Sequence, residues 1–331
     1  MTIAASLARL ALALILSSGL AAGSARATSW DDDYFTNLTL VTHEGDEVRL
    51  YDDLIRDKIV VFTFSYTLCP DICGLSTARL AQMVDWLGDR IGRDIFVYSI
   101  TLDPGTDTPE RLAEYREAFG APDGWVFLTG TQAEIDIVRH KLGERSRSLN
   151  EHRSDMVIGN GSTGQWRRMS VMGNLVTATE AVLSLDPSWR RPEPGPRSGT
   201  TTDDRRYTIS DTRGEGLFIT ACAACHSIGE GVRVGPDLAG VTLRRDPAWL
   251  QSFIRAPDRM LAAGDPTATA LDAAFPAVRM PNLGIGELDA QDLIHYLARQ
   301  AEDLGQSPVA TAEQAGDDGH GHAHGHGDHA H

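Results

Sequence analysis

The sequence has few cysteines, few basic residues and few long apolar runs. Its 331 residues include only four cysteines, too few for a disulfide scaffold, so each close pair of cysteines is read as a site. Lys and Arg total 30 against 46 Asp and Glu, for a net charge of −16. This balance argues against a nucleic-acid binder, whose phosphate contacts need clustered cations. The sequence contains no internal repeat of the kind that would indicate a solenoid. At ~100–200 residues per domain, the length predicts two domains.

The one apolar run that approaches membrane length is Leu10–Ala22. It is shorter than the ~20 residues that a spanning helix needs. Residues 1–27 contain no acidic residue and end in Ala25-Arg26-Ala27, a small-x-small cleavage signal. We therefore expect a cleaved signal peptide at 1–27, in preference to a membrane anchor, and a mature chain that is exported to the periplasm.

Residues 34–185 alternate between strand and helix patterns. The expected strands are Ile59–Tyr66, Ile95–Leu102 and Trp125–Leu128, followed by a hairpin of Met156–Ile158 and Trp166–Val171. The expected helices are Leu75–Ile91, Pro109–Phe119 with Thr108 as its N-cap, and Thr131–Leu142. This alternation predicts an α/β domain built around a mostly parallel sheet.

The pattern changes at residue 186. Residues 186–207 are rich in proline and glycine, which predicts a stiff, exposed linker. Residues 208–302 show helical periodicity and end with an expected helix at Glu287–Arg299, so the second domain is predicted to be all-α. Residues 303–331 are polar, and we expect them to be disordered without metal.

The polar tail is rich in histidine. Its histidines are His320, His322, His324, His326, His329 and His331. Neutral imidazoles bind Cu(II), Ni(II) and Zn(II). A loose, ion-gathering site and a solvated tail without a physiological ligand both stay open.

The second cysteine pair has the spacing of a c-type haem attachment site. Cys222-Ala223-Ala224-Cys225-His226 is a C-x-x-C-H motif. Two thiols one helical turn apart can each form a thioether to a haem vinyl group, and the adjacent histidine then lies under the iron as the proximal ligand. A zinc site would need two further ligands, and this domain has no other cysteine. We predict covalent haem c at Cys222, Cys225 and His226, with haem-attachment machinery as a partner.

The second axial ligand of the iron is expected to be Met280. This methionine precedes Pro281 in an irregular stretch before the last helix, and a methionine on a rigid loop can reach across a flat cofactor. Met260 is the rival. His295 is a weaker candidate, because it lies among apolar residues of the last helix and is expected to pack there.

The first cysteine pair, in Cys69-Pro70-Asp71-Ile72-Cys73, follows a buried strand and opens a helix. If the turn is helical, both sulfurs face the same way, and the helix N-terminus favours thiolate over thiol. Two thiolates suit Cu(I), a soft ion. They also suit a reversible disulfide with a catalytic role in thiol exchange, and a purely structural disulfide is the remaining alternative.

A third copper ligand would come from His43, His140 or His152. We favour His152, because a loop just before a strand could fold back onto the cysteine turn. His140 is expected to be exposed or at a helix edge, and His43 belongs to a turn. Asp71 and Asp103 are polar positions near the expected site. Asp103 or Asp107 could instead cap the following helix. None of these residues is assigned a catalytic role.

Residues 37–185 resemble the Sco/SenC family of copper-handling, thioredoxin-fold proteins. The matching stretches are FTFSYTLCPDICG, SITLDPGTDTPERLAEY and WVFLTG, with a looser match at EHRSDMVI. The resemblance implies copper at Cys69, Cys73 and His152. It also implies delivery of copper to the dinuclear copper site of a cytochrome c oxidase subunit, which makes that subunit the expected partner.

The segment from about 208 to 301 resembles a small class I cytochrome c. The resemblance rests on GLFITACAACH, on Gly235-Pro236-Asp237-Leu238, on Met280-Pro281 and on a closing helix that contains HYL. It implies His226 and Met280 as iron ligands and a protein that carries one electron. The chain is thus expected to be an α/β thioredoxin-like domain followed by an all-α cytochrome c domain.

Two redox centres on one chain suggest that they exchange electrons. A haem iron and a copper ion each move one electron, whereas a disulfide takes two, so haem pairs more simply with copper. The first hypothesis is therefore a copper-delivery and redox protein. A thiol–disulfide reductase that acts on the cysteines of the target, and a plain haem electron carrier with a docking module and a separate redox partner, are the alternatives.

Overall fold

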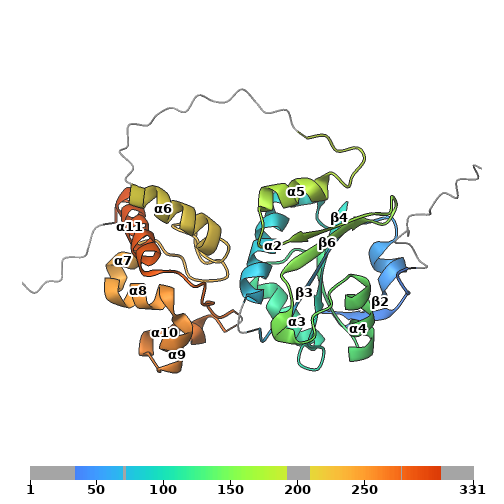
Figure 1. The fold of residues 1–331 in the computed structure, drawn as a ribbon, viewed down its shortest axis with the longest axis horizontal. Helices are drawn as coiled ribbons and strands as arrows, with labels where there is room; N and C mark the ends of the chain where they lie inside the picture. Colours follow the sequence, from blue (N-terminus) through green and yellow to red (C-terminus); the bar gives the residue numbers. More distant parts are fainter. Residues whose placement is uncertain (1–33, 70–71, 192–208, 277, 307–331) are drawn as a thin grey trace, which may run out of the picture.

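The computed structural model describes residues 34–69, 72–191, 209–276 and 278–306. The described residues before 192 form an α/β body, and those after 208 form a helical body (Figure 1). The expected signal peptide, the linker from residue 192 onward, Asp71 and the histidine tail lie outside the described residues. Within the described ranges, no helix is long and apolar enough to cross a membrane.

A sheet of seven strands forms the centre of the α/β body, in the order β2-β1-β5-β4-β3-β6-β7. The strands are β1 (Thr39–Thr42), β2 (Glu47–Arg49), β3 (Ile59–Ser65), β4 (Ile95–Thr101), β5 (Trp125–Thr129), β6 (Asp155–Asn160) and β7 (Gln165–Ser170). The three expected strands and the hairpin around Gly159–Gly164 are thereby confirmed. Strands β1 and β2, which the sequence reading did not identify, form a second hairpin around Gly45.

The expectation of a mostly parallel sheet was wrong. Only the β3–β4 and β4–β5 pairs are parallel, whereas β1–β2, β1–β5, β3–β6 and β6–β7 are antiparallel. The reason is that each edge of the sheet is a hairpin, and a short turn can join only antiparallel strands. The parallel part is limited to the strands that helical crossovers connect.

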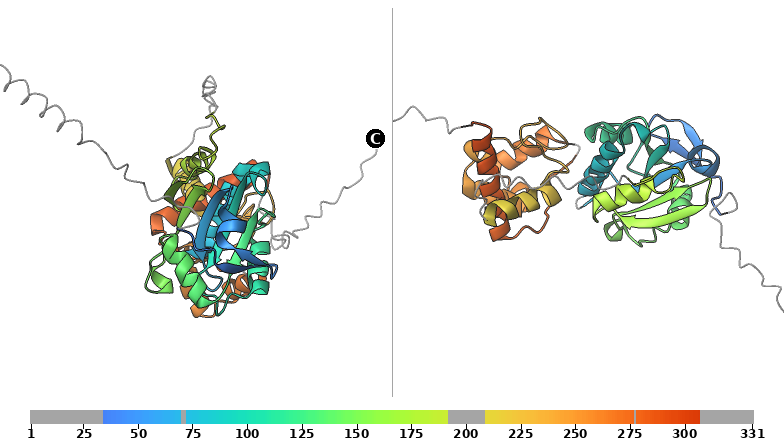
Figure 2. Two further views of the ribbon diagram at one scale, coloured as in Figure 1. Left: turned by 90° about the vertical axis from the view of Figure 1, so that its right-hand side faces the viewer. Right: turned by 90° about the horizontal axis from the view of Figure 1, so that it is seen from above.

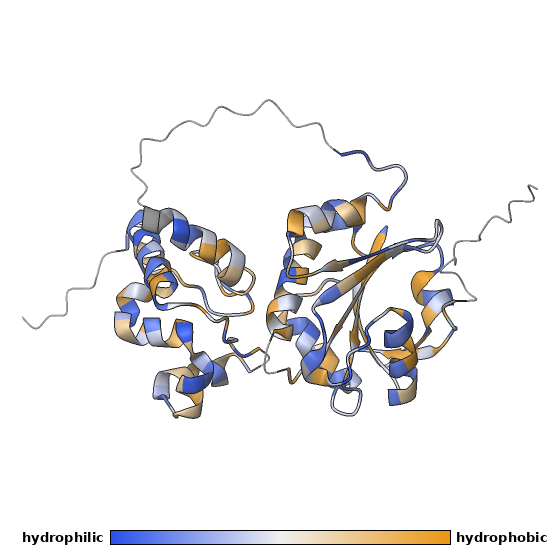
Figure 3. Ribbon diagram, in the orientation of Figure 1, coloured by the Kyte–Doolittle hydropathy of each residue, from blue (hydrophilic) through white to orange (hydrophobic). Residues whose placement is uncertain are grey.

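Helices cover both faces of the sheet. On one face lie α2 (Cys73–Leu87), α3 (Pro109–Ala118) and α5 (Leu175–Leu183), and on the other lie α4 (Gln132–Lys141) and the π-helical turn η1 (Leu50–Ile55). Apolar residues gather on the strands and on the inward sides of these helices (Figure 3). Strand β3 is buried along its whole length because both faces of the sheet are covered. The order β4-β3-β6-β7, with α2 after β3 and α5 after β7, is the thioredoxin arrangement.

Local signals position the helices that carry the site. The side chain of Thr108 accepts a hydrogen bond from the backbone N–H of Arg111, so the predicted N-cap of α3 is confirmed. Thr131 and Glu134 form a capping box at the start of α4. Two 3₁₀ turns, η2 (Gly88–Arg90) and η3 (Leu149–Glu151), follow α2 and precede β6.

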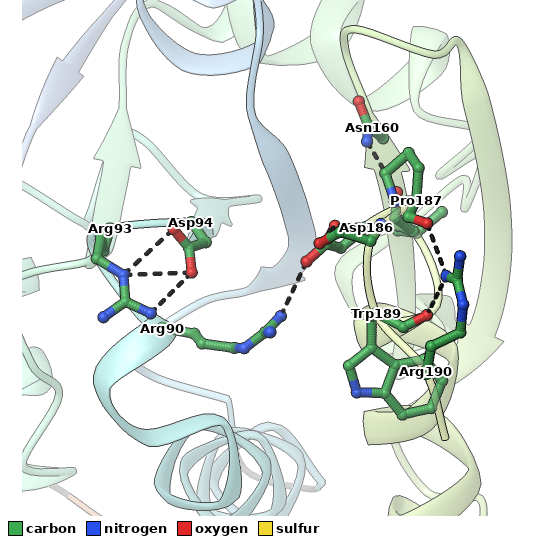
Figure 4. A network of polar contacts seen from close by, with 10 residues as sticks. Arg90, Arg93, Asp94, Asn160, Asp186, Pro187, Trp189 and Arg190 are labelled. Carbon is green, nitrogen blue, oxygen red and sulfur yellow. Dashed lines mark hydrogen bonds and ion pairs between the residues drawn. The ribbon is translucent and has the colours of Figure 1, made fainter. Parts of the chain in front are cut away.

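The end of the α/β body is held by polar contacts (Figure 4). Arg90 forms an ion pair with Asp186, at 3.3 Å, and the amide of Asn160 donates to the carbonyl oxygen of Leu185, at 2.8 Å. Arg190 donates to the carbonyl oxygens of two residues just before it. Asp186, the first residue of the expected linker, is therefore tied to η2, and the residue before it is tied to β6.

The helical body contains no strand among its described residues. Its elements are α6 (Ile209–Leu217), η4 (Phe218–Cys222), α7 (Val241–Arg244), α8 (Pro247–Arg255), α9 (Pro257–Ala262), α10 (Pro266–Ala274) and α11 (Glu287–Asp303). Phe218, Leu293 and Leu297 form the centre of its core. The last helix ends at Asp303, four residues beyond the expected end at Arg299. Helix α2 lies on the side of the α/β body that faces these helices (Figures 1 and 2).

Candidate functional site

The first cysteine pair lies in the turn between β3 and α2. Cys69 and Cys73 form a disulfide bond, with 5.8 Å between their Cα atoms. Cys73 is the first residue of α2 and is fully buried, whereas Cys69 is half-buried. Exposed Leu68 and Ile72 flank the pair. An incoming thiolate can therefore reach the sulfur of Cys69 more easily than that of Cys73.

His152 lies against this pair, 79 residues later in the chain. Its Nε2 atom is 3.3 Å from the Sγ atom of Cys73, and its Nδ1 atom is 3.0 Å from the carbonyl oxygen of Leu149. A carbonyl oxygen can only accept a hydrogen bond, so the proton of the neutral ring lies on Nδ1. The lone pair of Nε2 then points toward the sulfur, the orientation that a metal-binding imidazole needs.

The two rival histidines are elsewhere. His43 is buried at the β1–β5 pair, where its ring lies edge-on to that of Phe127. Burial lowers the pKa of His43, so this ring is neutral near pH 7. His140 is exposed at the end of α4, as expected. Of the three candidates, only His152 is brought to the cysteine turn.

With the disulfide closed, no group of three metal-binding side chains is arranged around a common point in the described part of the chain. The Cys69–Cys73 bond ties up both sulfurs, and reduction by two electrons and two protons is required to release them. The structure thus represents the oxidised form of the pair. Metal binding at these residues would require the reduced form.

Asp107 supports the loop that leads to Cys69. It is fully buried and accepts hydrogen bonds from the backbone N–H of Thr67, at 3.1 Å, and from the hydroxyl of Thr101, at 2.6 Å. The hydroxyl of Thr67 also donates to it and accepts from Nε of Arg111. Because Thr108 caps α3, the suggestion that Asp103 or Asp107 caps this helix was wrong. Asp107 instead joins two loops across 40 residues, a contact that sequence reasoning missed.

The second cysteine pair forms one turn of helix. The backbone N–H groups of Cys225 and His226 both donate to the carbonyl oxygen of Cys222, at 3.0 and 2.9 Å. Both cysteines are free. Burial raises the pKa of the Cys222 thiol to about 11 and that of Cys225 to about 12, so both are protonated near pH 7. Two free thiols on one turn fit thioether attachment of a haem.

His226 is oriented in the same way as His152. Its Nδ1 atom is 2.8 Å from the carbonyl oxygen of Pro236, which places the ring proton there and leaves Nε2 as an acceptor. Burial lowers the pKa of His226, which favours the neutral ring that binds a metal. A Cβ atom on Gly235 would lie 2.6 Å from Cε1 of His226, so the backbone packs directly against the imidazole.

A carboxylate fixes the loop behind His226. Asp237 accepts hydrogen bonds from the backbone N–H groups of Gly229, Gly231 and Ala239 and from the hydroxyl of Ser227. Burial by itself would raise the pKa of Asp237, but these hydrogen bonds outweigh it and lower the pKa to about 2. The anionic form is therefore part of the fold of this loop.

An apolar crevice connects His226 with Met280. The crevice has about 790 Å³ of empty space, part of it open to solvent. Cys222, Cys225, His226 and Met280 all line it. The rival ligand Met260 does not line it. His295 is exposed on α11, so its expected packing was wrong; this position faces outward on the amphipathic helix. The donor set and the apolar walls fit a haem.

The crevice is also lined by a residue of the other body. Leu75, from α2, contributes to the same wall as Val278 and Leu283. Arg79, about one helical turn further along α2, donates from Nη1 to the carbonyl oxygen of Thr220, at 3.3 Å. Neither residue was singled out by the sequence analysis, because its role depends on which body covers α2.

These features define a thioredoxin-fold domain with a cysteine pair and a histidine at the start of its first core helix, joined to a helical domain of the c-type haem class. Residues 27–158 match the SCO1/SenC family model, and residues 212–301 match the cytochrome c model. The chain therefore contains a SCO1/SenC domain and a cytochrome c domain, as the sequence resemblance predicted. The cytochrome c domain implies covalently attached haem c.

Known proteins are similar to the first of these domains. Protein sco1 of Schizosaccharomyces pombe is 33% identical over 104 residues, which cover 31% of this chain and 38% of that protein. SenC of Rhodobacter capsulatus is 35% identical over 98 residues, which cover 30% of this chain and 42% of that protein. Both matches thus span about two fifths of the relative. A crystal structure of yeast Sco1 with copper bound is 24% identical, covers 46% of this chain and 91% of that chain, and has a TM-score of 0.39.

Proposed function

We propose that this chain is an exported, copper-binding redox protein of the Sco type, in which a fused c-type haem passes single electrons. The observation that carries the proposal is the position of His152, whose Nε2 lone pair is directed at Cys73 from 3.3 Å. Reduction of the disulfide would place two sulfurs and one imidazole nitrogen at one point. This is a donor set for Cu(I), because soft thiolates and imidazole both bind copper.

The two sulfurs have different roles in this proposal. Cys69 is half-buried, so it is the sulfur that an external thiolate would attack and the ligand that a receiving protein would reach first. Cys73 is fully buried at the start of α2, so it and His152 retain the metal until transfer is complete. The hydrogen bond from His152 Nδ1 to Leu149 keeps the ring in the binding orientation throughout.

The helical domain would hold its haem through four residues. Cys222 and Cys225 are proposed to form the two thioethers, and His226 and Met280 would bind the iron; all four residues line the crevice. When bound, the haem supplies a one-electron iron couple, which His/Met ligation raises in potential. The carbonyl oxygen of Pro236 fixes the His226 ring, and the crevice around the ring is lined mainly by apolar residues.

The proposed task is the maturation of a copper site in another protein. The Sco/SenC resemblance supports the dinuclear copper site of a cytochrome c oxidase subunit as the destination and the periplasm as the location. Haem-attachment machinery is then a further partner. The haem domain would set the oxidation state of the copper, because each centre moves one electron.

A second candidate function is thiol–disulfide exchange. The observation that favours it is the closed Cys69–Cys73 disulfide, with one accessible and one buried sulfur, as a dithiol reductant requires. In this case the cysteines of the oxidase subunit would be the substrate. His152 would then have no essential part, and this difference separates the two functions.

Titration with Cu(I) tests the proposal. The chain is first reduced anaerobically, and Cu(I) affinity is measured against a colorimetric chelator. We expect one Cu(I) per chain, loss of binding in Cys69→Ser, and an affinity lower by at least about tenfold in His152→Ala. His140→Ala, which changes an exposed histidine of the same domain, is the matched control and should bind as the parent does. Equal affinity in both histidine variants, with dithiol exchange intact, would instead establish the reductase.

A further inference from the structure

The start of helix α2 is covered by the helical domain. Gly74 has so little room that a Cβ atom there would lie 2.8 Å from Cγ1 of Val278. The next residue, Leu75, is 4% exposed and lines the crevice that contains His226. The helix begins at Cys73 of the disulfide. The helix that begins at Cys73 therefore contributes Leu75 to the lining of the haem crevice.

The contact between the domains is apolar and continuous with a core. Ala224, which lies between the two haem-attaching cysteines, is 6% exposed and belongs to the apolar cluster under α2, α3 and α5. Cys225, Val234, Val278 and Leu283 pack against the same cluster. Burial of apolar surface favours such an arrangement by roughly 25 cal/mol per Å². The haem-attachment turn is thus packed as part of the core of the first domain.

A buried arginine joins the two domains beside this contact. Arg79 is 8% exposed, and its Nε and Nη2 atoms donate to the carbonyl oxygens of Val171 and Gly173, at 3.0 and 2.6 Å. Its Nη1 atom donates to Thr220, two residues before Cys222. Among the described residues, its hydrogen bonds go to backbone carbonyl oxygens. Separation of the domains would break the hydrogen bond to Thr220 and leave that donor to be solvated by water, while the two bonds within the first domain would remain.

We infer that helix α2 is the docking surface on which the haem domain sits, with Gly74 and Leu75 as its contact and Arg79 as its latch. The role that we give to this docking, electron exchange between the haem and the cysteine site, rests on the proposed function. Leu75 lies two residues after Cys73, and that spacing in a helix is about 5.4 Å between Cα atoms. Docking therefore sets a short, fixed path between the haem crevice and the cysteine pair. Helices α8, α9 and α10 also contribute lining residues to the crevice.

Two glycine variants of the haem-loaded full chain test the docking. Gly74→Leu inserts a side chain toward Val278, whereas Gly216→Leu, in α6, makes the same change where no atom lies within 4 Å. Small-angle X-ray scattering reports whether the domains are docked. We expect a compact particle for the parent and for Gly216→Leu, and a larger radius of gyration for Gly74→Leu. A parent that scatters as two independent domains, or a Gly74→Leu chain as compact as the parent, overturns the inference.

Variants at Arg79 give a second, independent measurement. Arg79→Gln removes the charge and the reach to Thr220, and it should extend the particle, whereas Arg79→Lys keeps the charge and should restore part of the docking. Equal scattering of Arg79→Gln and the parent contradicts the latch. Because scattering needs no copper, this outcome is separate from the outcome of the Cu(I) titration.

Electron exchange links the docking to the proposed function. One equivalent of Cu(II) is added to the anaerobic chain with ferrous haem and free thiols, and haem oxidation is followed by absorbance; Fe(II) loses the electron that reduces Cu(II) to Cu(I). We expect Gly74→Leu to slow this oxidation roughly tenfold or more relative to Gly216→Leu, because a misplacement of about 1 Å between reacting groups can cost up to about 100-fold. No exchange in the parent refutes the coupling, while equal rates in both variants refute the role of α2.

Discussion

Removal of the Asp107 carboxylate should loosen the loop that presents Cys69. Asp107 is fully buried and accepts hydrogen bonds from the backbone N–H and hydroxyl of Thr67 and from the hydroxyl of Thr101. Thr67 lies two residues before Cys69 in the same turn. The substitution Asp107→Ala leaves these three donors without their acceptor in a buried place, so both the stability of the domain and the geometry of the cysteine pair should suffer.

The size of the effect follows from these hydrogen bonds. A hydrogen bond to a charged group contributes about 1.5–3 kcal/mol, so three of them give an upper bound of about 4.5–9 kcal/mol. Water can enter the space left by the side chain, and neighbouring contributions are not additive. We therefore expect Asp107→Ala to lower the free energy of unfolding by about 3–4 kcal/mol. Asp107→Asn keeps one acceptor oxygen and the shape, and it should cost about half as much.

Urea unfolding, followed by circular dichroism and tryptophan fluorescence, measures the loss in the α/β domain, whose transition is fitted separately from that of the haem domain. The reduced variant should also bind Cu(I) roughly 10–100-fold more weakly, because Asp107 positions a ligand-bearing loop. Asp103→Asn, in the same loop, is the control. A loss below about 1 kcal/mol for Asp107→Ala, with Cu(I) affinity equal to that of the control, would refute this reasoning.

Three further predictions concern the haem domain. The fold lowers the pKa of Asp237 from its ordinary value of 3.8 to about 2. Its carboxylate therefore stabilises the domain above pH 3.8, and this stabilisation is lost as the pH falls toward 2. Acid unfolding followed in the Soret region should show this loss of stability in the parent and not in Asp237→Asn. Gly235→Ala places a methyl group 2.6 Å from Cε1 of His226, and it should shift the haem spectrum by displacing the ring. Met280→Ala should lower the haem reduction potential, measured by titration, whereas Met260→Ala should leave it unchanged. An equal effect of the two methionine variants would remove Met280 from the site.

The two cysteine pairs differ in ways that match different tasks. Cys69 and Cys73 form a disulfide in which Cys69 is half-buried and Cys73 is fully buried. Cys222 and Cys225 are half-buried, and burial raises the pKa of both thiols, which keeps them protonated and poorly nucleophilic near pH 7. One pair is therefore suited to exchange with other molecules, and the other to a permanent covalent link.

Much of this protein is determined by local sequence. The alternation of buried strands and amphipathic helices predicted the α/β domain, because side-chain periodicity directly reflects the pleat and the helical turn. The turn from Cys222 to His226 was predictable for the same reason, since its groups lie within one helical turn of each other. The caps at Thr108 and Thr131 are likewise contacts over three residues.

The sequence favoured His152 over His43 and His140 as the partner of the cysteine turn, and His152 does meet Cys73 across 79 residues. Other contacts between distant segments could not be determined from the sequence. Asp107 meets Thr67 across 40 residues, and Arg79 meets Thr220 across 141. Each requires the sheet order and the docking of two bodies. Those depend on how all the apolar faces are buried together rather than on any local pattern. The apolar side of α2 could be predicted as buried, but only the tertiary structure decided that its first turn is buried against the crevice of the other domain.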